Sequence, residues 1–563
     1  MEIKASKKFI ITDLSWERIF LNFTIEVDCA DDVTFQLRRF NRKEKIKRTK
    51  TELKVEYNLI SRETLEIDYE KKEGNVYTFS LNIAAIKGRS FINNGKWHIL
   101  AITPEGKHIC SVTPAVAYKA EDNSRVFEYY GGKYCYNMTF SSYTEDEENL
   151  TFVMGSAFMI MNDKWYKRKY VKEARTLPGK FQRAYMSAVI FLIKVYYQIA
   201  EHLLPKRGKN ILFMSETKDY LWGNLLFIDQ RLRERGLDKD FKITHSCRKS
   251  VGQHKSAFSW LKVVTEIARQ DFIFIDDYAP IFGFLNLNKR TKLIQVWHAG
   301  EGFKAVGYCR FGKSGSPFPV GSCHKKYDYV LTGSRKLNRV FEEVFGIEKD
   351  AFLPVGMARL DGFLEPRRIA EFRKGFYEQY PGFEDRKIIL FAPTFRGTGQ
   401  KTAYYDYSQL DLAQLYEFCG EEYVFLIKMH PFVHEAITIP GEFQDRIIDF
   451  SDYPTINDLY YVTELLITDY SSNYFEYALM EKPVLFFTYD RELYELTRGV
   501  HRSVKDSAPG KVCDTFGELM DALKTRDFEE EKIHQFVKDN FSEYDGHASD
   551  RVIDQILIKK EEA

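Results

Sequence analysis

The chain has 563 residues, 44% of them hydrophobic, and this length suggests three or four structural units rather than a single core. Lys and Arg (82) balance Asp and Glu (81) to a net charge of +1, so overall charge does not indicate a nucleic-acid-binding protein. The eight cysteines form no C-x-x-C pair and no close Cys/His cluster, which argues against a zinc module or disulfide scaffold and favours a reducing cytosol. The opening residues lack the apolar stretch of a secretory signal peptide.

Residues 1–160 have the composition and spacing of β-strands. Runs of β-branched and aromatic residues separated by charged turns include FLNFTIEV, LKVEYNLI, NVYTFSLNI and KWHILAITP. We expect a β-rich N-terminal domain, arranged as an antiparallel sandwich and without catalytic residues. His98 and His108 lie in strand-like sequence and are interpreted as structural.

Residues 161–209 combine basic and apolar sequence. The run AYMSAVIFLIKVYYQIA (184–200) is interrupted by Lys194 and is shorter than the roughly 20 residues that cross a bilayer. Basic residues on both sides, such as Lys167, Arg168 and Lys169, are typical of helices on a membrane surface. The alternative is a core helix that links two domains and has solvated basic ends.

From residue 210 onward, short apolar runs alternate with helix-like sequence. The segment 210–375 contains KNILFMSE, FKITHS, DFIFIDD, KLIQVWH and YDYVLTGS, and the segment 376–563 contains KIILFAPTFRG, YVFLIKMHP, RIIDFSD, ELLITDYSS and KPVLFFTYD. This alternation is the βα signature of parallel, doubly wound sheets. We therefore expect an α/β protein with two Rossmann-like lobes and a cleft between them.

Polar residues follow most of these strands, at the sheet edge where ligands bind in such folds. They are Gly223, Asn224, Asp276, Asp277, His298, Thr394, Arg396, Lys428, His430, Asp469, Ser471 and Ser472. The set suits phosphate chemistry, because a guanidinium can fork onto phosphate oxygens and a helix start favours an anion. The alternatives for single residues are that Asp469 caps a helix and that Arg396 pairs with a carboxylate.

Two histidines from different lobes, His298 and His430, are the candidate bases, because imidazole titrates near neutral pH. Gly300 and Gly302 follow the first of them and would let the backbone approach a phosphate. No cofactor or metal is expected. The acidic pair Asp276-Asp277, which follows an apolar strand, leaves a metal site open as a minor alternative.

Six motifs in this order resemble the CDP-alditol polyolphosphotransferases of teichoic acid synthesis. They are WHAGEGFKAVGYCRFGK (297–313), VGMARLD (355–361), LFAPTFRGTG (390–399), KMHPF (428–432), ITDYSSNYFEYALMEKPVLFF (467–487) and APGK (508–511). The resemblance covers roughly residues 210–545. The Trp-His-Ala start and the Gly-Tyr-x-Arg-x-Gly-Lys end of the first motif are most similar to the ribitol-phosphate polymerase branch, as is the β-rich N-terminal segment.

The resemblance implies a GT-B-type pair of lobes, the acceptor side at 210–375 and the donor side at 376–563. It places the essential histidines at His298 and His430. The donor contacts it implies are Ala299, Gly300, Glu301, Gly302, Arg359, Thr394, Arg396, Lys428, Met429, Ser471, Ser472 and Glu476; the strand-end pattern adds Asp469, Gly223 and Asn224 as substrate-binding candidates.

The implied reaction transfers ribitol phosphate from CDP-ribitol to an undecaprenyl-diphosphate-linked polyol-phosphate acceptor, with release of CMP, by a peripheral protein on the cytoplasmic face of the membrane. The alternatives are the same reaction with CDP-glycerol, a GT-B glycosyltransferase that uses a nucleotide sugar, and a non-catalytic scaffold at the membrane. The alditol, the number of units added, formation of a homo-oligomer and the identity of the general base stay open.

Overall fold

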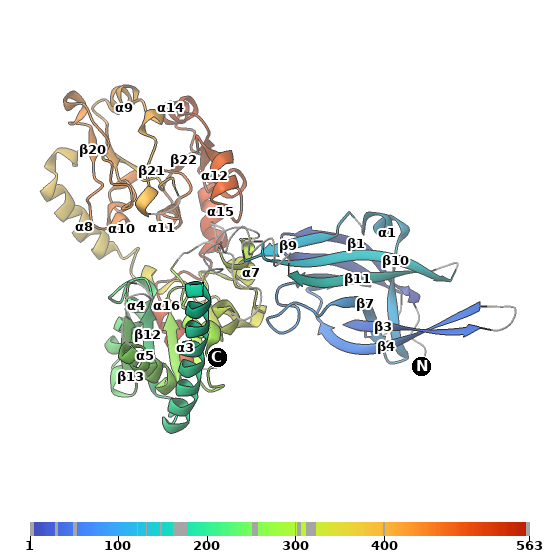
Figure 1. The fold of residues 1–563 in the computed structure, drawn as a ribbon. Helices are drawn as coiled ribbons and strands as arrows, with labels where there is room; N and C mark the ends of the chain where they lie inside the picture. Colours follow the sequence, from blue (N-terminus) through green and yellow to red (C-terminus); the bar gives the residue numbers. More distant parts are fainter. Residues whose placement is uncertain are drawn as a thin grey trace. The chain divides into compact units, whose positions relative to one another are not determined.

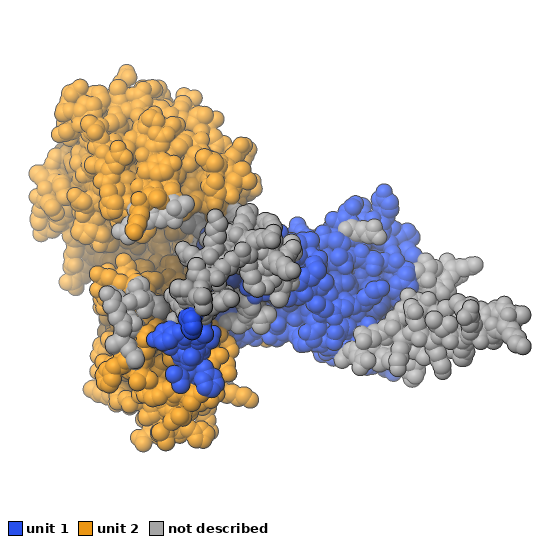
Figure 2. Space-filling model, in the orientation of Figure 1, with its two compact units in different colours: residues 1–192, 306–325, 342–349 blue, residues 193–305, 326–341, 350–563 orange. Residues whose placement is uncertain are grey.

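The computed structural model describes residues 5–28, 32–48, 53–120, 122–130, 132–146, 149–160, 177–249, 257–298, 300, 306–310, 322–397 and 400–558. The chain divides into two compact units (Figure 2). Unit 1 comprises Met1–Leu192, Val306–Lys325 and Glu342–Lys349, and unit 2 comprises Ile193–Ala305, Lys326–Phe341 and Asp350–Ala563.

Unit 1 is rich in β-structure, as the sequence predicts (Figure 1). Its elements are β1 (Ala5–Glu17), β2 (Phe20–Val27), β3 (Thr34–Arg48), β4 (Leu53–Ile67), β5 (Lys71–Glu73), β6 (Val76–Asn82), β7 (Gly95–Thr103), β8 (Gly106–Val112), α1 (Pro114–Ala120), β9 (Arg125–Tyr129), β10 (Tyr134–Asp146) and β11 (Asn149–Ile160). These strands form one hydrogen-bonded sheet with the main order β4-β3-β7-β11-β8-β1-β2-β6-β5. Neighbouring strands are antiparallel except β1 and β8, which pair in parallel.

This sheet folds over on itself. Strands β3 and β6 are far apart in the sheet order, and a flat sheet would separate them by several strand spacings of about 4.8 Å. The ring of Phe35 in β3 nevertheless lies 5.0 Å from that of Phe79 in β6, and both side chains are buried in one core. Where a sandwich was expected, the described strands thus enclose their core with a single folded sheet.

Two later segments complete unit 1, although the sequence assigned them to the first lobe. Tyr308 is part of the same core, with its ring 6.0 Å from that of Tyr129. Glu343 accepts a hydrogen bond from Arg18 Nε at 2.6 Å, and Lys325 Nζ donates to the Ala84 carbonyl at 2.7 Å. These contacts explain why residues 306–325 and 342–349 cluster with the β-rich domain.

The described residues of unit 2 form two parallel six-stranded sheets, which matches the predicted pair of α/β lobes. The first has the order β13-β12-β14-β15-β16-β17. Its elements are β12 (Asn210–Ser215), α4 (Gly223–Glu234), β13 (Lys242–Cys247), α5 (Ala257–Arg269), β14 (Phe272–Ile275), α6 (Ile281–Phe284), β15 (Lys292–Gln295), β16 (Tyr329–Leu331), α7 (Arg335–Phe345) and β17 (Phe352–Leu353). The strand order reverses direction between β12 and β14, which is the topological switch point of a doubly wound sheet.

The second sheet has the order β20-β19-β18-β21-β22-β23, with its switch point between β18 and β21. The elements of this lobe are α8 (Pro366–Gln379), β18 (Lys387–Phe391), α9 (Leu412–Cys419), β19 (Tyr423–Ile427), β20 (Ile447–Asp449), α10 (Ile456–Leu459), β21 (Thr463–Thr468), α11 (Tyr474–Ala478), β22 (Val484–Phe487), α12 (Arg491–Thr497), α13 (Val504–Ser507), β23 (Lys511–Cys513), α14 (Phe516–Thr525) and α15 (Glu531–Asn540).

The end of the chain returns to the first lobe. Helix α16 (Ala548–Val552) and the π-helical turn Ile553–Ile558 contribute Val552 and Ile556 to the core beneath β12 and β15. Asp550 of α16 accepts hydrogen bonds at 3.0 Å from Arg231 and Arg235, at the end of α4. A single boundary at residue 375/376 therefore does not separate the two lobes.

Helix α3 (Leu177–Leu203) lies in the predicted basic and apolar segment, and the cations Lys167, Arg168 and Lys169 fall outside the described residues. Its second half packs on the first lobe. Tyr196 shares a 2.7 Å hydrogen bond with Thr265 of α5, and the side chain of Tyr197 is buried. Within the described residues, no helix combines the length and the apolar character needed to cross a membrane.

Candidate active site

His298 lies just beyond the carboxyl end of β15, and its ring orientation is fixed by the neighbouring strand β14. Its Nδ1 is 3.0 Å from the backbone carbonyl oxygen of Asp276. A carbonyl oxygen only accepts hydrogen bonds, so Nδ1 carries the proton and the neutral ring keeps its lone pair on Nε2. The half-buried imidazole is therefore in the tautomer of a base.

The backbone before His298 is held in a strained conformation. Trp297 has φ +50°, in the left-handed region that non-glycine residues rarely adopt. Its backbone N–H donates to Gln295 Oε1 at 2.9 Å, and its carbonyl accepts from Asn224 Nδ2 at 2.9 Å. Asn224 Nδ2 also donates to the Val296 carbonyl at 3.0 Å. Asn224, predicted as a substrate contact, thus binds the His298 loop, while Gly223 begins α4 with φ +53°.

The carboxylate of Asp276 lies beneath this loop. Its Oδ2 accepts hydrogen bonds from Ser215 Oγ at 2.9 Å and Trp222 Nε1 at 2.8 Å, while Oδ1 is buried and has no hydrogen-bond partner among the described residues. Burial raises the pKa of Asp276. Asp277 Oδ1 accepts from the Tyr278 backbone N–H at 2.6 Å. The bonds to Asp276 Oδ2 tie the end of β14 to the end of β12 and to Trp222.

Arg359 connects the His298 loop to the second lobe. Its Nη1 donates to the His298 carbonyl at 2.7 Å, and its backbone N–H donates to Asn224 Oδ1 at 3.0 Å. Its Nη2 forms a buried ion pair with Glu476 of α11. Burial lowers the pKa of Arg359 to about 10. Arg359 and Glu476, both predicted as donor contacts, therefore pair with each other across the two lobes of unit 2.

A second contact between the lobes involves the glycine-rich loop. A Cβ placed on Gly300 would lie 2.1 Å from Cδ1 of Phe475 in α11, so only glycine fits there. The close approach was expected to serve a phosphate, but here an aromatic ring occupies the space. Ala299, Glu301 and Gly302 of the predicted loop lie outside the described residues.

His430 follows β19 in the second lobe and has the opposite hydrogen-bond pattern. Its Nδ1 accepts a hydrogen bond from the Phe432 backbone N–H at 3.2 Å. In the neutral ring the proton is therefore on Nε2, which acts as a donor. The ring packs against Phe395 and Phe432, with centroid distances of 4.8 and 4.9 Å.

Lys428 and Met429 precede His430, and both face inward. Lys428 Nζ donates to the Ser451 carbonyl at 2.5 Å, and burial lowers its pKa. The Met429 side chain is part of the lobe's core, and its backbone N–H donates to Ser451 Oγ at 3.2 Å. These contacts anchor the strand end that presents His430.

Arg396 is engaged by carboxylates instead of lying open to a phosphate. Its Nε and Nη2 donate to Asp490 at 2.7 and 2.9 Å, and its Nη1 donates to Asp469 at 2.6 Å and to the Thr394 carbonyl at 3.0 Å. Four aromatic rings surround the guanidinium carbon at 5.1 to 5.4 Å: Tyr405, Tyr470, Tyr489 and Tyr494. These bonds use four of the five N–H groups of the guanidinium, so Arg396 cannot form the expected two-bond contact with phosphate oxygens. Arg396 and the fully buried Asp469 instead form a structural ion pair.

Thr394 follows β18, which borders the switch point of the second sheet. Its backbone N–H donates to Asp469 Oδ1 at 2.7 Å, while its buried Oγ1 has no hydrogen-bond partner in the part of the chain that the structure describes. Ser471 and Ser472 are half-buried between β21 and α11. The sequence did not reveal Trp222 as a partner of Asp276 or Asp490 as a partner of Arg396, because nothing in either local segment distinguishes them from surface residues.

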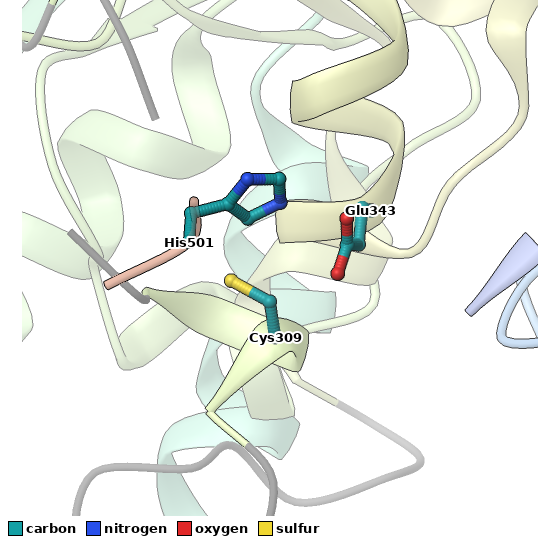
Figure 3. A group of neighbouring side chains, drawn as sticks. All are labelled: Cys309, Glu343 and His501. Atoms are coloured by element: carbon teal, nitrogen blue, oxygen red, sulfur yellow. The ribbon is translucent and has the colours of Figure 1, made fainter. Parts of the chain in front are cut away.

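A further cluster of possible metal ligands involves unit 1. Cys309 Sγ and a carboxylate oxygen of Glu343 lie within 4.8 Å of each other (Figure 3). Glu343 already accepts from Arg18, and burial raises the pKa of the Cys309 thiol to about 12, so the thiolate is disfavoured. His501, the third residue labelled in Figure 3, belongs to unit 2, and we infer no metal site from the three.

Comparisons with known proteins agree with this architecture. Residues 195–558 match the family described as CDP-Glycerol:Poly(glycerophosphate) glycerophosphotransferase. The teichoic acid poly(ribitol-phosphate) polymerase of Bacillus spizizenii is 38% identical over 64% of this chain and 58% of its own length. The ribitol-phosphate polymerases TarK and TarL of Staphylococcus aureus are 34% identical (65% of this chain, 72% of TarK) and 31% identical (68% of each chain).

Among solved structures, the wall teichoic acid polymerase TagF superposes with a TM-score of 0.50 at 22% identity, covering 68% of this chain and 96% of TagF. A variant of TagF gives a TM-score of 0.51 at 21% identity over the same shares. These values establish a common fold for the two lobes. Since the family match covers more than half of the residues, this chain belongs to the CDP-glycerol:poly(glycerophosphate) glycerophosphotransferase family.

Proposed function

We propose that this protein transfers ribitol phosphate from CDP-ribitol to the terminal hydroxyl of a lipid-linked polyol-phosphate chain. The family match and the three ribitol-phosphate polymerases among its relatives support this donor. The observation that carries the mechanism is the opposite hydrogen bonding of the two histidines: Nδ1 of His298 donates to a carbonyl, and Nδ1 of His430 accepts from a backbone N–H.

In this proposal the acceptor hydroxyl oxygen attacks the β-phosphorus of the donor, and Nε2 of His298 takes the hydroxyl proton. A bond forms between the acceptor oxygen and the β-phosphorus, while the bond from that phosphorus to the bridging oxygen breaks. CMP leaves with the bridging oxygen and its electron pair. The Nε2–H of His430 donates to the phosphate oxygens that gain charge. His298 is thus the base and His430 the donor.

The reacting groups meet, we propose, in a GT-B-like cleft between the lobes, with the donor on the second one. The Arg359–Glu476 pair and the contact of Gly300 with Phe475 support this, because both join the His298 loop to α11. Arg359, Glu476 and Asn224 then position His298 instead of binding the nucleotide. Thr394, Ser471 and Ser472 remain the proposed diphosphate contacts, with Lys428 behind them.

The decisive experiment incubates the full chain and a lipid-linked acceptor with CDP-ribitol, CDP-glycerol or UDP-sugars, and measures released CMP or UDP. We expect CMP from CDP-ribitol, and its loss in His298→Ala with donor binding retained. CMP from CDP-glycerol alone would change the alditol, and UDP release would favour a glycosyltransferase. Full activity of His298→Ala would refute the role of this base.

We also propose that α3 holds the protein on the cytoplasmic membrane surface. Its exposed apolar side chains fall on one stripe of about 120° of the helix surface, opposite the face packed on the first lobe. They are Phe181, Tyr185, Phe191, Leu192, Val195, Ile199 and Leu203. Basic residues precede the helix in sequence, which suits anionic lipids.

Vesicle sedimentation tests this surface. The double change Leu192→Asp and Ile199→Asp should release the protein from anionic vesicles while CMP release from a soluble acceptor stays unchanged. The matched control Glu371→Gln, on the exposed side of α8, should leave binding intact. Equal binding of both variants would show that another part of the chain contacts lipid.

A further inference from the structure

One arginine that contacts Phe395, the ring packed against His430, has no role in the site described above. Arg498 follows α12, and its backbone N–H donates to the Tyr494 carbonyl at 2.8 Å, which continues the helical pattern. Its guanidinium carbon lies 4.9 Å from the centroid of the Phe395 ring. The same ring lies 4.8 Å from that of His430. Arg498 and His430 therefore contact one aromatic side chain at the carboxyl edge of the second sheet.

The position of this guanidinium is fixed by the loop after β18. Nη1 of Arg498 donates to the Gly397 carbonyl at 2.8 Å, and the face of Phe395 supports the cation. Helix α12 is held in place by Tyr494, whose ring stacks on Tyr470 at 3.9 Å. The side chain is thus pre-organised rather than free to rotate in solvent, which limits the entropy lost on binding an anion.

The charge of Arg498 is not neutralised within the described part of the chain, where it pairs with no carboxylate. Arg396, directly before Gly397, has the opposite status, because Asp469 and Asp490 compensate its charge. Arg498 is half-buried, so it is partly desolvated and still accessible. Such a guanidinium can donate charge-assisted hydrogen bonds to phosphate oxygens, which are roughly twice as strong as bonds between neutral groups.

We propose that Arg498 binds the diphosphate of the nucleotide donor, beside His430. This inference rests on the proposed function and deepens it. The motif LFAPTFRGTG indicated Arg396 as the phosphate-binding guanidinium, whereas we assign that role to Arg498, more than a hundred residues further along the chain. As the β-phosphorus is attacked, charge grows on the bridging oxygen, and a guanidinium fixed at this place stabilises the departing CMP.

The test measures the affinity of the full chain for cytidine, CMP and CDP by titration calorimetry. Arg498→Gln should weaken CDP binding about 10- to 100-fold, the range of a charge-assisted hydrogen bond, with a smaller effect on CMP and little on cytidine. Arg498→Lys keeps the charge but loses the fork, so it should fall between wild type and Arg498→Gln. The control Arg367→Gln removes an equal charge from a side chain that is 83% exposed on α8.

Several results would overturn the inference. Unchanged CDP affinity in Arg498→Gln, or an equal loss for all three ligands, would leave Arg498 a purely structural residue of the loop. Unchanged nucleotide affinity with a raised KM for the acceptor would assign it to the acceptor phosphates instead. If Arg498→Gln does not fold, wild-type CDP affinity in Arg498→Lys refutes it. Failure of the proposed function is distinct: wild type would bind CDP yet release no CMP from any CDP-alditol.

Discussion

Replacing Asn224 by Ala tests whether the strained loop before His298 controls catalysis. The side-chain amide donates to the carbonyls of Val296 and Trp297, and its oxygen accepts from the Arg359 backbone N–H. Each such bond contributes about 1 kcal/mol net. Trp297 at φ +50° is itself unfavourable by about 1–2 kcal/mol, so it needs this support.

Losing the two bonds nearest the strain should disfavour the native loop by about 2–3 kcal/mol. If the relaxed loop misdirects Nε2 of His298, this corresponds to a fall in kcat of roughly 30- to 160-fold. The KM for the nucleotide donor should change little, because the side-chain amide of Asn224 hydrogen-bonds to backbone groups and does not face a ligand. The assay is CMP release at saturating acceptor over a range of CDP-ribitol concentrations.

A matched control is Asn540→Ala, since Asn540 is also buried and donates to a backbone carbonyl, that of Phe536, at 2.9 Å. It should reduce the melting temperature without a comparable fall in kcat. The reasoning would be refuted if Asn224→Ala raised the donor KM while kcat stayed at the wild-type value, because that pattern indicates a direct substrate contact.

Three further outcomes are expected. Arg396→Met should lower the free energy of unfolding of unit 2, measured by urea titration, by about 3–5 kcal/mol, because Asp469 stays buried without its cation. Wild-type stability together with a raised KM for the donor would contradict this. Glu476→Gln should lower kcat and leave the KM for the donor unchanged, because Arg359 loses its charged partner. A raised KM with normal kcat would instead show that Glu476 contacts the donor. Burial lowers the pKa of Lys325 from 10.5 to about 7, so between these values the unfolded chain binds more protons and stability rises with pH, whereas below about pH 7 both states are protonated and this dependence ends. The free energy of unfolding, from urea titrations at pH 6 to 9, should therefore rise above pH 7 by at most about 1.4 kcal/mol per pH unit more in wild type than in Lys325→Met; parallel pH dependences would refute the assignment.

The sequence alone determined the class of the fold and the sheet edge at which we propose that the chemistry lies. Short apolar runs alternating with helical sequence specify parallel sheets, because each strand is buried on both faces and must be joined to the next by a crossover. The carboxyl ends of such strands share one edge, so His298, Thr394 and His430 could be placed there from spacing alone. The motif order was also enough to indicate the family, which the comparison with known proteins confirmed.

The folded β-sheet of unit 1 and the destinations of distant segments could not be predicted in the same way. Strands with the same alternation of apolar and polar residues can enclose a core either as two sheets or as one sheet that folds over. Which of the two forms depends on pairings between residues far apart in sequence, such as those of β1 with β8. The return of α16 to the first lobe likewise depends on a buried apolar face meeting the core of β12.

Tertiary structure alone decided which polar residues at the sheet edges are left for a ligand. Arg396 and Asp469 are 73 positions apart, and Arg359 and Glu476 are 117 positions apart, yet each pair is buried in direct contact. A guanidinium followed by glycine has the same local sequence whether a phosphate or a carboxylate lies opposite. The physical reason is that charge pairing depends on distance through space. A buried cation is strongly destabilising unless a carboxylate lies next to it, and only the fold determines which carboxylate that is.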